Sequence, residues 1–224
     1  MVRKYNDIYL TPTASHVNTL IWMHGLGDSA EGFLDVFTDP AINPVTNDTK
    51  VVLLTADSRP VTINAGMIMP SWYDMKVLSA DLNSKLSLEQ RISVPEIKDS
   101  YNLINSVVNE EVKNLKGKLI IGGFSQGCVM ALYVGLENPN VKAIFGFSGY
   151  LTSLTKLTNL GKIPIHLFHG EKDEKIPCLD FAKKTYEPLL KDGKAIFYME
   201  KMLGHILNIK QLVNFKKLFA DAVK

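Results

Sequence analysis

Short apolar runs rich in β-branched residues alternate along the chain with segments whose apolar positions recur at helical spacing. Several of these runs are apolar on consecutive residues, which is typical of strands that are buried on both faces of a mostly parallel sheet. The pattern predicts strands over residues 18–23, 50–54, 118–121, 141–147, 163–168 and 194–199.

Helices are predicted between these strands. The first is expected to begin with a capping box, because Ser93 and Glu96 have the S-x-x-E spacing and Pro95 is tolerated in a first turn. Further helices are expected over 126–137, from about 179 to 190, and from about 206 to the end. Two of the helices have an apolar face, formed by Ile97, Tyr101, Ile104, Val108 and Leu115 in the first and by Ile209, Leu212, Phe215, Phe219 and Val223 in the last.

Strands that alternate with helices predict an α/β fold, a three-layer sandwich with a mostly parallel central sheet and helices on both faces. The 224 residues, of which 46% are hydrophobic, suffice for one core, so a single domain over 1–224 is expected. One long stretch, residues 55–93, has only a weak pattern. Loops of this length in compact domains usually shape a site.

Charge and targeting signals narrow the function classes. With 25 basic and 23 acidic residues the formal net charge is only +2, which argues against a nucleic-acid partner. The first 15 residues lack the apolar stretch of a secretion signal, and no later run approaches the roughly 20 residues that span a bilayer. We therefore expect a soluble cytoplasmic protein.

The two cysteines, Cys128 and Cys178, do not have the spacing of a disulfide framework or a zinc site. This spacing suits a reducing compartment, and no metal is expected. Cys128 lies close to the start of a predicted helix, where a thiol can become reactive. A packed, unreactive thiol is the favoured interpretation.

A G-x-S-x-G motif, Gly123-Phe124-Ser125-Gln126-Gly127, directly follows the strand KLIIG and directly precedes an apolar helix. A tight strand-to-helix turn of this kind exposes its serine, and the flanking glycines let the backbone turn sharply. The motif alone is a weak signal, but its placement between strand and helix strengthens it. Ser125 is the predicted nucleophile.

A serine nucleophile needs a histidine base and a carboxylate that orients it, and this fold places both downstream of the serine. Among His166, His169 and His205, His166 lies inside a predicted strand and His169 ends it. His205 follows the last strand in a Gly-His turn, which is the expected position for the base. The loop 171–177 offers three acids, Glu171, Asp173 and Glu174, and spacing leaves the choice open.

An oxyanion hole requires two N–H groups aimed at one oxygen. Gln126 follows the nucleophile and supplies one at a helix N-terminus. The second is expected from the glycine-containing loop His24-Gly25-Leu26-Gly27-Asp28. The same loop is also explained as a turn in which Asp28 or Ser29 caps the next helix.

Together these motifs resemble the acyl-protein thioesterase and carboxylesterase family of small α/β-hydrolases. HGLGDSAEGF, RPVT, MPSWYD, GGFSQG, HGEKDEKIP and the final GH occur in the family's order over nearly the whole chain. The resemblance implies an α/β-hydrolase fold with Ser125 as nucleophile, Asp173 as acid and His205 as base. It also implies oxyanion donors at the backbone N–H groups of Leu26 and Gln126, and needs no metal or cofactor.

For function, the resemblance implies release of fatty acyl groups from S-acylated proteins. The alternatives are a general carboxylesterase or lysophospholipase acting on lipid esters, and a non-catalytic binding protein with the same fold. An acyl groove is expected beside Ser125, and Trp72 and Met69 are candidates to line it, with core packing as the competing role for Trp72. At most transient contact with a membrane surface is expected, and a homodimer stays open. Residues 74–93, in the family's lid region, match poorly.

Overall fold

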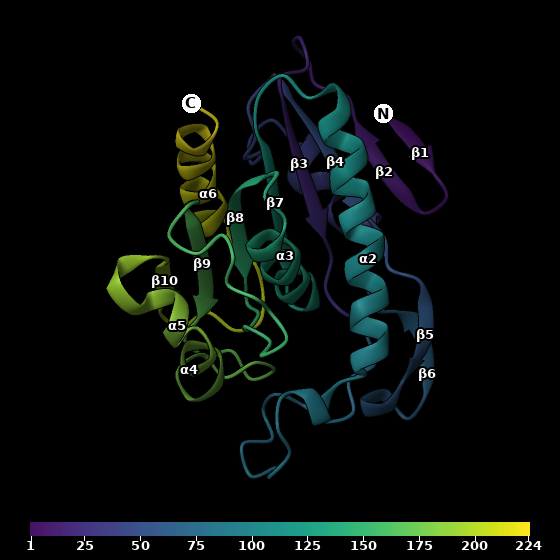
Figure 1. Cartoon of the computed structure of the whole chain (residues 1–224), viewed down its shortest axis with the longest axis vertical. Helices are drawn as coiled ribbons and strands as arrows, with labels where there is room; N and C mark the ends of the chain where they lie inside the picture. Colours follow the sequence, from purple (N-terminus) through teal and green to yellow (C-terminus); the bar gives the residue numbers. More distant parts are fainter.

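The computed structural model describes residues 1–224, except for the side chain of Asp192. The main sheet has eight strands in the order β1-β2-β4-β3-β7-β8-β9-β10 (Figure 1). Its central strands run parallel, and the prediction of a mostly parallel sheet is confirmed; β1 and β2 are antiparallel at one edge. The strands are β1 (Val2–Lys4), β2 (Asp7–Leu10), β3 (Asn18–Met23), β4 (Thr49–Leu54), β7 (Leu119–Phe124), β8 (Val141–Phe147), β9 (Ile165–Gly170) and β10 (Ile196–Glu200).

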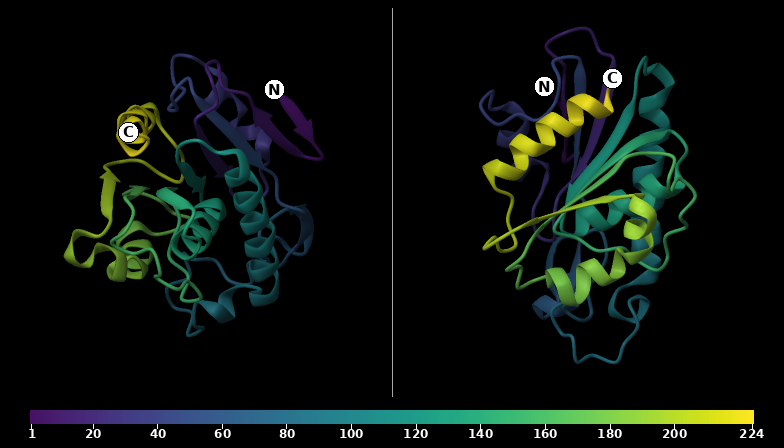
Figure 2. Two further views of the ribbon diagram at one scale, coloured as in Figure 1. Left: turned by 45° about the horizontal axis from the view of Figure 1, so that its top comes forward. Right: turned by 90° about the vertical axis from the view of Figure 1, so that its left-hand side faces the viewer.

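Both faces of the sheet are buried, as the consecutive apolar residues of its strands require. In β3, Ile21 and Met23 pack on one face and Leu20 and Trp22 on the other. Figure 2 shows the last helix across the sheet from the longest one, so the three-layer prediction is confirmed. The Ile21 face is covered by α2 (Val94–Glu111) and α3 (Gln126–Glu137), and the Trp22 face by α1 (Leu34–Thr38) and α6 (Ile209–Ala222).

Helix α3 lies in the core and is buried along almost its whole length. A helix that is apolar all round must be covered on every side, and α3 contacts both the sheet and α2. Gly135 permits this close packing, because a Cβ there would lie 2.7 Å from Ile144. The helix begins directly after Ser125, so the position of the serine is set by a helix that is buried in the core.

Three predictions for the helices need correction. Ser93 is the N-cap of α2, but the capping box does not form, since the Ser93 side chain makes no capping hydrogen bond and Glu96 accepts instead from the backbone N–H of Asp74 at 2.6 Å. Ile209 is exposed rather than on the buried face of α6. The helix expected over 179–190 is divided near Pro188, which cannot donate a backbone N–H, into a π-helical turn (Cys178–Ala182), α4 (Lys183–Thr185) and α5 (Glu187–Leu190).

The weakly patterned segment 55–93 contains a small antiparallel pair that the sequence analysis did not predict, β5 (Ser58–Val61) and β6 (Met67–Pro70). The rest of the segment is organised by the mostly buried Arg91, whose guanidinium donates to the backbone carbonyls of Leu78, Asp81, Ser84 and, more distantly, Leu86. Short 3-10 turns occupy Ala30–Phe33, Thr62–Asn64, Glu89–Arg91, Val112–Asn114 and Lys191–Gly193. None of the described helices combines the length and the apolar character needed to cross a membrane.

Candidate active site

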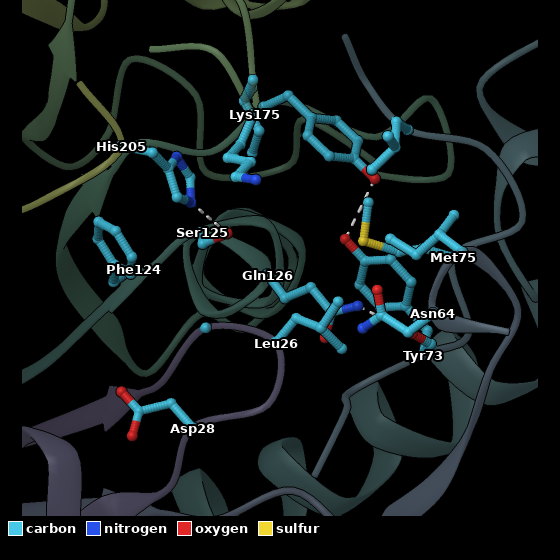
Figure 3. Close-up of a pocket in the computed structure, with 15 residues that line it drawn as sticks. Leu26, Asp28, Asn64, Tyr73, Met75, Phe124, Ser125, Gln126, Lys175 and His205 are labelled. Carbon is cyan, nitrogen blue, oxygen red and sulfur yellow. Dashed lines mark hydrogen bonds between the residues drawn. The ribbon is translucent and has the colours of Figure 1, made fainter. Parts of the chain in front are cut away.

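The loops that carry the predicted site residues meet at one edge of the sheet. In a parallel sheet the carboxyl ends of the strands lie together, and ligands bind in the crevice beyond them. Leu26 follows β3, Ser125 follows β7, Asp173 follows β9 and His205 follows β10. Figure 3 shows Leu26, Ser125 and His205 around one pocket.

Ser125 occupies a strained turn between β7 and α3. Its backbone has φ 56° and ψ −118°, a conformation that costs a residue with a side chain about 1–3 kcal/mol. The turn is held by a hydrogen bond from the Ser125 N–H to the carbonyl of Phe147 at 2.8 Å. A Cβ on Gly127 would lie 2.1 Å from the carbonyl oxygen of Met23, so only glycine fits this close approach. The turn therefore presents the serine hydroxyl to the pocket.

A continuous hydrogen-bond chain links Ser125, His205 and Asp173. His205 Nε2 lies 3.0 Å from Ser125 Oγ, and His205 Nδ1 lies 2.7 Å from Asp173 Oδ2. The imidazole also packs against the ring of Phe124, with a centroid distance of 4.9 Å. With Nδ1 protonated towards the carboxylate, Nε2 is free to accept the hydroxyl proton.

Of the three acids in the loop 171–177, Asp173 alone faces His205. It is buried, whereas Glu174 is exposed and Glu171 partly so. Asp173 Oδ1 accepts backbone N–H bonds from Lys175 at 2.9 Å and Ile176 at 2.8 Å. Burial by itself raises the pKa of Asp173, but the hydrogen bonds from two histidines and from Ile176 outweigh it and hold that pKa well below its usual value.

The acid loop and the turn that carries His205 are tied together by their backbones. The N–H of Lys172 donates to the carbonyl of Leu203 at 2.8 Å. Gly170 permits this contact, since a Cβ there would lie 2.3 Å from the same carbonyl oxygen. The separation between acid and base is thus fixed by main-chain contacts rather than by long side chains.

Histidine 169 is a site residue that the sequence analysis passed over. It is fully buried, and its Nε2 lies 2.8 Å from the carbonyl oxygen of Ile176 and 3.2 Å from Asp173 Oδ2. Its position at the end of a predicted strand was used only to reject it as the base. Its spacing of four residues from Asp173 was the available signal, but it did not distinguish a contact from a coincidence.

The proposed oxyanion donors lie beside Ser125. In the loop 24–28, the neighbouring backbone N–H groups already donate to other carbonyls. That of Gly27 donates to Pro70 at 2.8 Å and that of Asp28 to Gly25 at 3.2 Å. Within the described part of the chain, the backbone N–H groups of Leu26 and Gln126 have no hydrogen-bond acceptor. Both residues line the pocket, Leu26 from the first loop and Gln126 from the start of α3.

His24 anchors the loop that carries Leu26. Its Nδ1 donates to the carbonyl of Gly25 at 2.6 Å, and its Nε2 accepts the backbone N–H of Ala56 at 3.0 Å. Both nitrogens are therefore used when the ring is neutral. Burial lowers the pKa of His24, which favours this neutral form.

The cavity beside Ser125 has a volume of about 320 Å³ and is mainly apolar. Trp72 does not line it, which corrects its candidacy for the acyl groove and leaves core packing, the competing role. Its ring is 1% exposed and its Nε1 donates to the carbonyl of His24, so Trp72 belongs to the core. Met69 also lies outside the lining, with its sulfur accepting from Asn64. The lining residues include Leu26, Ile63, Asn64, Tyr73, Met75, Leu78, Phe124, Tyr150, Lys175 and Ile176.

Both cysteines are buried free thiols. Burial raises the pKa of Cys128 to about 12, which supports the interpretation as a packed, unreactive thiol. Within the described residues, no group of three or more histidine, cysteine, aspartate or glutamate side chains is arranged to hold a metal ion.

Comparison with curated proteins identifies relatives over most of the chain. An acyl-protein thioesterase 1 of Yarrowia lipolytica is 32% identical over 199 residues, covering 85% of this chain and 84% of that protein. One of Schizosaccharomyces pombe is 33% identical over 187 residues, covering 80% and 79%.

Solved structures share the fold. The crystal structure of Zea mays acyl-protein thioesterase 2 has a TM-score of 0.80 at 22% identity and covers 97% of this chain and 99% of its own. The Bacillus cereus carboxylesterase has a TM-score of 0.72 at 17% identity, with coverages of 96% and 93%. The family model described as Phospholipase/Carboxylesterase matches residues 8–213. The chain is therefore a hydrolase with the α/β-hydrolase fold, and it belongs to the phospholipase/carboxylesterase family.

Proposed function

We propose that this protein is an acyl-protein thioesterase that removes fatty acyl groups from cysteine side chains, with Ser125 as nucleophile, His205 as base and Asp173 as the acid behind it. The observation that carries the proposal is the hydrogen-bond chain from Ser125 Oγ through His205 to Asp173, at 3.0 and 2.7 Å. Relatives named acyl-protein thioesterase 1 support the substrate class.

In the first half-reaction, Ser125 Oγ attacks the acyl carbonyl while His205 Nε2 takes the hydroxyl proton. The carbonyl oxygen becomes negative and accepts hydrogen bonds from the backbone N–H groups of Leu26 and Gln126. Asp173 stabilises the His205 imidazolium. When the tetrahedral intermediate collapses, the imidazolium gives its proton to the departing thiolate, and the acyl group stays on Ser125 as an ester.

In the second half-reaction, water replaces the thiol. His205 takes a proton from the water as it attacks the acyl ester, and the same two N–H groups stabilise the second oxyanion. The proton then returns to Ser125 Oγ as the fatty acid leaves. Atoms balance without a further co-reactant, since one thioester and one water yield one acid and one thiol.

The apolar cavity suits a fatty acyl chain. Leu26, Ile63, Met75 and Leu78 supply apolar surface beside the serine. Burying each methylene of the chain is worth about 0.8 kcal/mol, so the depth of the cavity sets the chain-length preference. Figure 3 shows Tyr73 on the side of the pocket away from His205. Its hydroxyl lies 3.1 Å from that of Tyr150, and this pair forms the polar far wall.

Lys175 favours a second candidate, hydrolysis of lysophospholipids. Its side chain lines the same pocket and reaches in near His205 (Figure 3). Among the described residues no carboxylate lies within ion-pair distance of its ammonium group. A cation there suits a substrate with a phosphate near the scissile ester.

A substrate panel separates the two candidates. Purified protein is given a palmitoylated cysteine peptide, the matching serine oxyester peptide and a palmitoyl lysophospholipid, and kcat/KM is measured for each. The thioesterase proposal predicts that the cysteine peptide is preferred. Preference for the lysophospholipid, abolished in Lys175→Ala, supports the second candidate instead.

The matched controls use the same substrates. Ser125→Ala is expected to lose at least about a thousandfold in kcat, while Ser153→Ala, in a surface loop, keeps the wild-type rate. Ordinary turnover by folded Ser125→Ala contradicts the proposed mechanism.

A further inference from the structure

The carboxylate of Asp173 is contacted by two histidines. His205 Nδ1 lies 2.7 Å from Oδ2, and His169 Nε2 lies 3.2 Å from the same oxygen. The Asp173 and His169 side chains are both fully buried, so water does not satisfy the carboxylate. Oδ1 is already occupied by the N–H groups of Lys175 and Ile176.

The surroundings of His169 determine which nitrogen carries its hydrogen. Nε2 faces two acceptors, the carbonyl of Ile176 at 2.8 Å and Asp173 Oδ2. Nδ1 is buried and has no hydrogen-bond partner among the described residues. A hydrogen on Nδ1 would be a buried donor without an acceptor, which costs about 1–3 kcal/mol. The hydrogen therefore belongs on Nε2, where it faces the carbonyl oxygen of Ile176 and Asp173 Oδ2.

We propose that His169 is a positioning residue of this hydrolase. Its Nε2–H holds Asp173 Oδ2 in position for the hydrogen bond with His205 and limits how strongly the carboxylate attracts the His205 proton. The inference rests on the proposed function, since it assigns His169 a role in the Ser125 reaction. His169 does not line the pocket and touches no reacting atom, so it acts only through Asp173.

The proposal predicts a direction for the pH profile. A carboxylate that loses one donor is more basic and stabilises the His205 imidazolium more strongly. A lower proton concentration then suffices to protonate the base. The acid limb of the kcat/KM profile therefore moves to higher pH. The same loss also leaves Oδ2 less constrained, which lowers kcat without changing KM.

Other titratable groups around His169 and Asp173 do not account for the acid limb of the kcat/KM profile. Burial raises the pKa of the Cys178 thiol to about 11, and it raises that of the Tyr186 phenol well above its usual value. Both groups stay uncharged over the acid limb. Of the remaining charged side chains of the acid loop, Lys172, Glu174 and Lys175 are exposed and Glu171 is partly so. The ring of Phe197 packs against His169 from β10.

The test compares His169→Leu, which removes the donor, with His169→Gln, whose amide N–H reaches about as far as imidazole Nε2. In His169→Leu we expect kcat to fall roughly tenfold to a hundredfold at constant KM, the loss of one hydrogen bond to a charged group. The acid limb should rise by about half a pH unit or more. His169→Gln should restore both quantities most of the way.

Thermal unfolding of each variant is measured in parallel. A purely structural role predicts a lower Tm in both variants with an unmoved acid limb, and that result overturns the inference. Failure of the wild type itself to hydrolyse the thioester refutes the proposed function and not the positioning role. If neither variant folds, nitrogen NMR of the wild type decides, because finding the hydrogen of His169 on Nδ1 contradicts the proposal.

Discussion

The side-chain amide of Gln126 donates to the backbone carbonyl of Tyr73 at 2.8 Å, which ties the residue after the serine to a segment more than fifty positions away. Its Oε1 accepts the backbone N–H of Trp72 at 3.0 Å and the hydroxyl of Ser71 at 3.2 Å. Gln126 thus serves the site twice, with its backbone N–H beside Ser125 and its side chain bracing one wall of the pocket.

Replacement of Gln126 by alanine should impair both stability and catalysis. The backbone groups of Trp72 and Tyr73 lose buried partners, at a cost of about 2–4 kcal/mol. For a chain of this size we expect Tm to fall by about 5–12 °C. Because the start of α3 is less constrained, kcat should fall about tenfold or more. Gln90→Ala, at an exposed position, is the control and should change neither Tm nor kcat.

Shortening Tyr150 should lengthen the preferred acyl chain. Its ring closes the pocket beside Tyr73, so Tyr150→Ala extends the cavity. Each further methylene accommodated should raise kcat/KM about fourfold. Hydrolysis of octanoyl, dodecanoyl and hexadecanoyl thioesters measures the shift. Tyr101→Ala on α2, away from the pocket, should leave the ranking of chain lengths unchanged; an unchanged ranking in Tyr150→Ala would refute the assignment of the pocket wall.

Thiol reagents should leave the native enzyme active. Burial raises the pKa of Cys128 to about 12, and the side chain is inaccessible. A deeply buried thiol is a poor nucleophile at neutral pH. We expect no iodoacetamide adduct on Cys128 by mass spectrometry until denaturant is added. Rapid modification of the native protein with loss of activity would contradict the burial of the Cys128 thiol.

Acidification should destabilise the protein partly through His24. Burial lowers its pKa in the folded state below the unfolded value of about 6.5. Its contribution to stability is therefore complete above that pH and is lost as the pH falls, because the unfolded chain takes up the proton first. Between about pH 7.5 and 5.5, His24→Gln should lose less of its unfolding free energy than wild type. Burial lowers the pKa of His166 as well, so some dependence persists in the variant.

The sequence predicted the interior of this fold better than its edges. Helix α3 matches the expected bounds because a glycine-flanked serine starts it and Asn138-Pro139 ends it. Strand β1 was missed, since its residues are all exposed and show no apolar pattern. The pair β5–β6 was also missed, because Pro60 and Pro70 favour a loop in a local analysis and only the pairing itself makes them strands.

The site shows the same division between local and long-range information. Ser125 and His205 follow from local turns at strand ends. The roles of Trp72 and His169 do not, because each depends on which distant backbone or carboxylate meets the ring. From the sequence, an apolar segment next to a glycine-containing loop fits a binding groove and a buried core equally well. Only the hydrogen bond from Trp72 to His24 places it in the core.

The most direct test of the account is labelling with a fluorophosphonate probe, followed by peptide mass spectrometry. Wild-type protein should acquire one adduct, on Ser125, and His205→Ala should acquire it more slowly by about a thousandfold or more because the base is missing. Folded wild-type protein that acquires no adduct on Ser125, or that is labelled equally fast without His205, would contradict the claim that this hydroxyl is activated by His205 and Asp173.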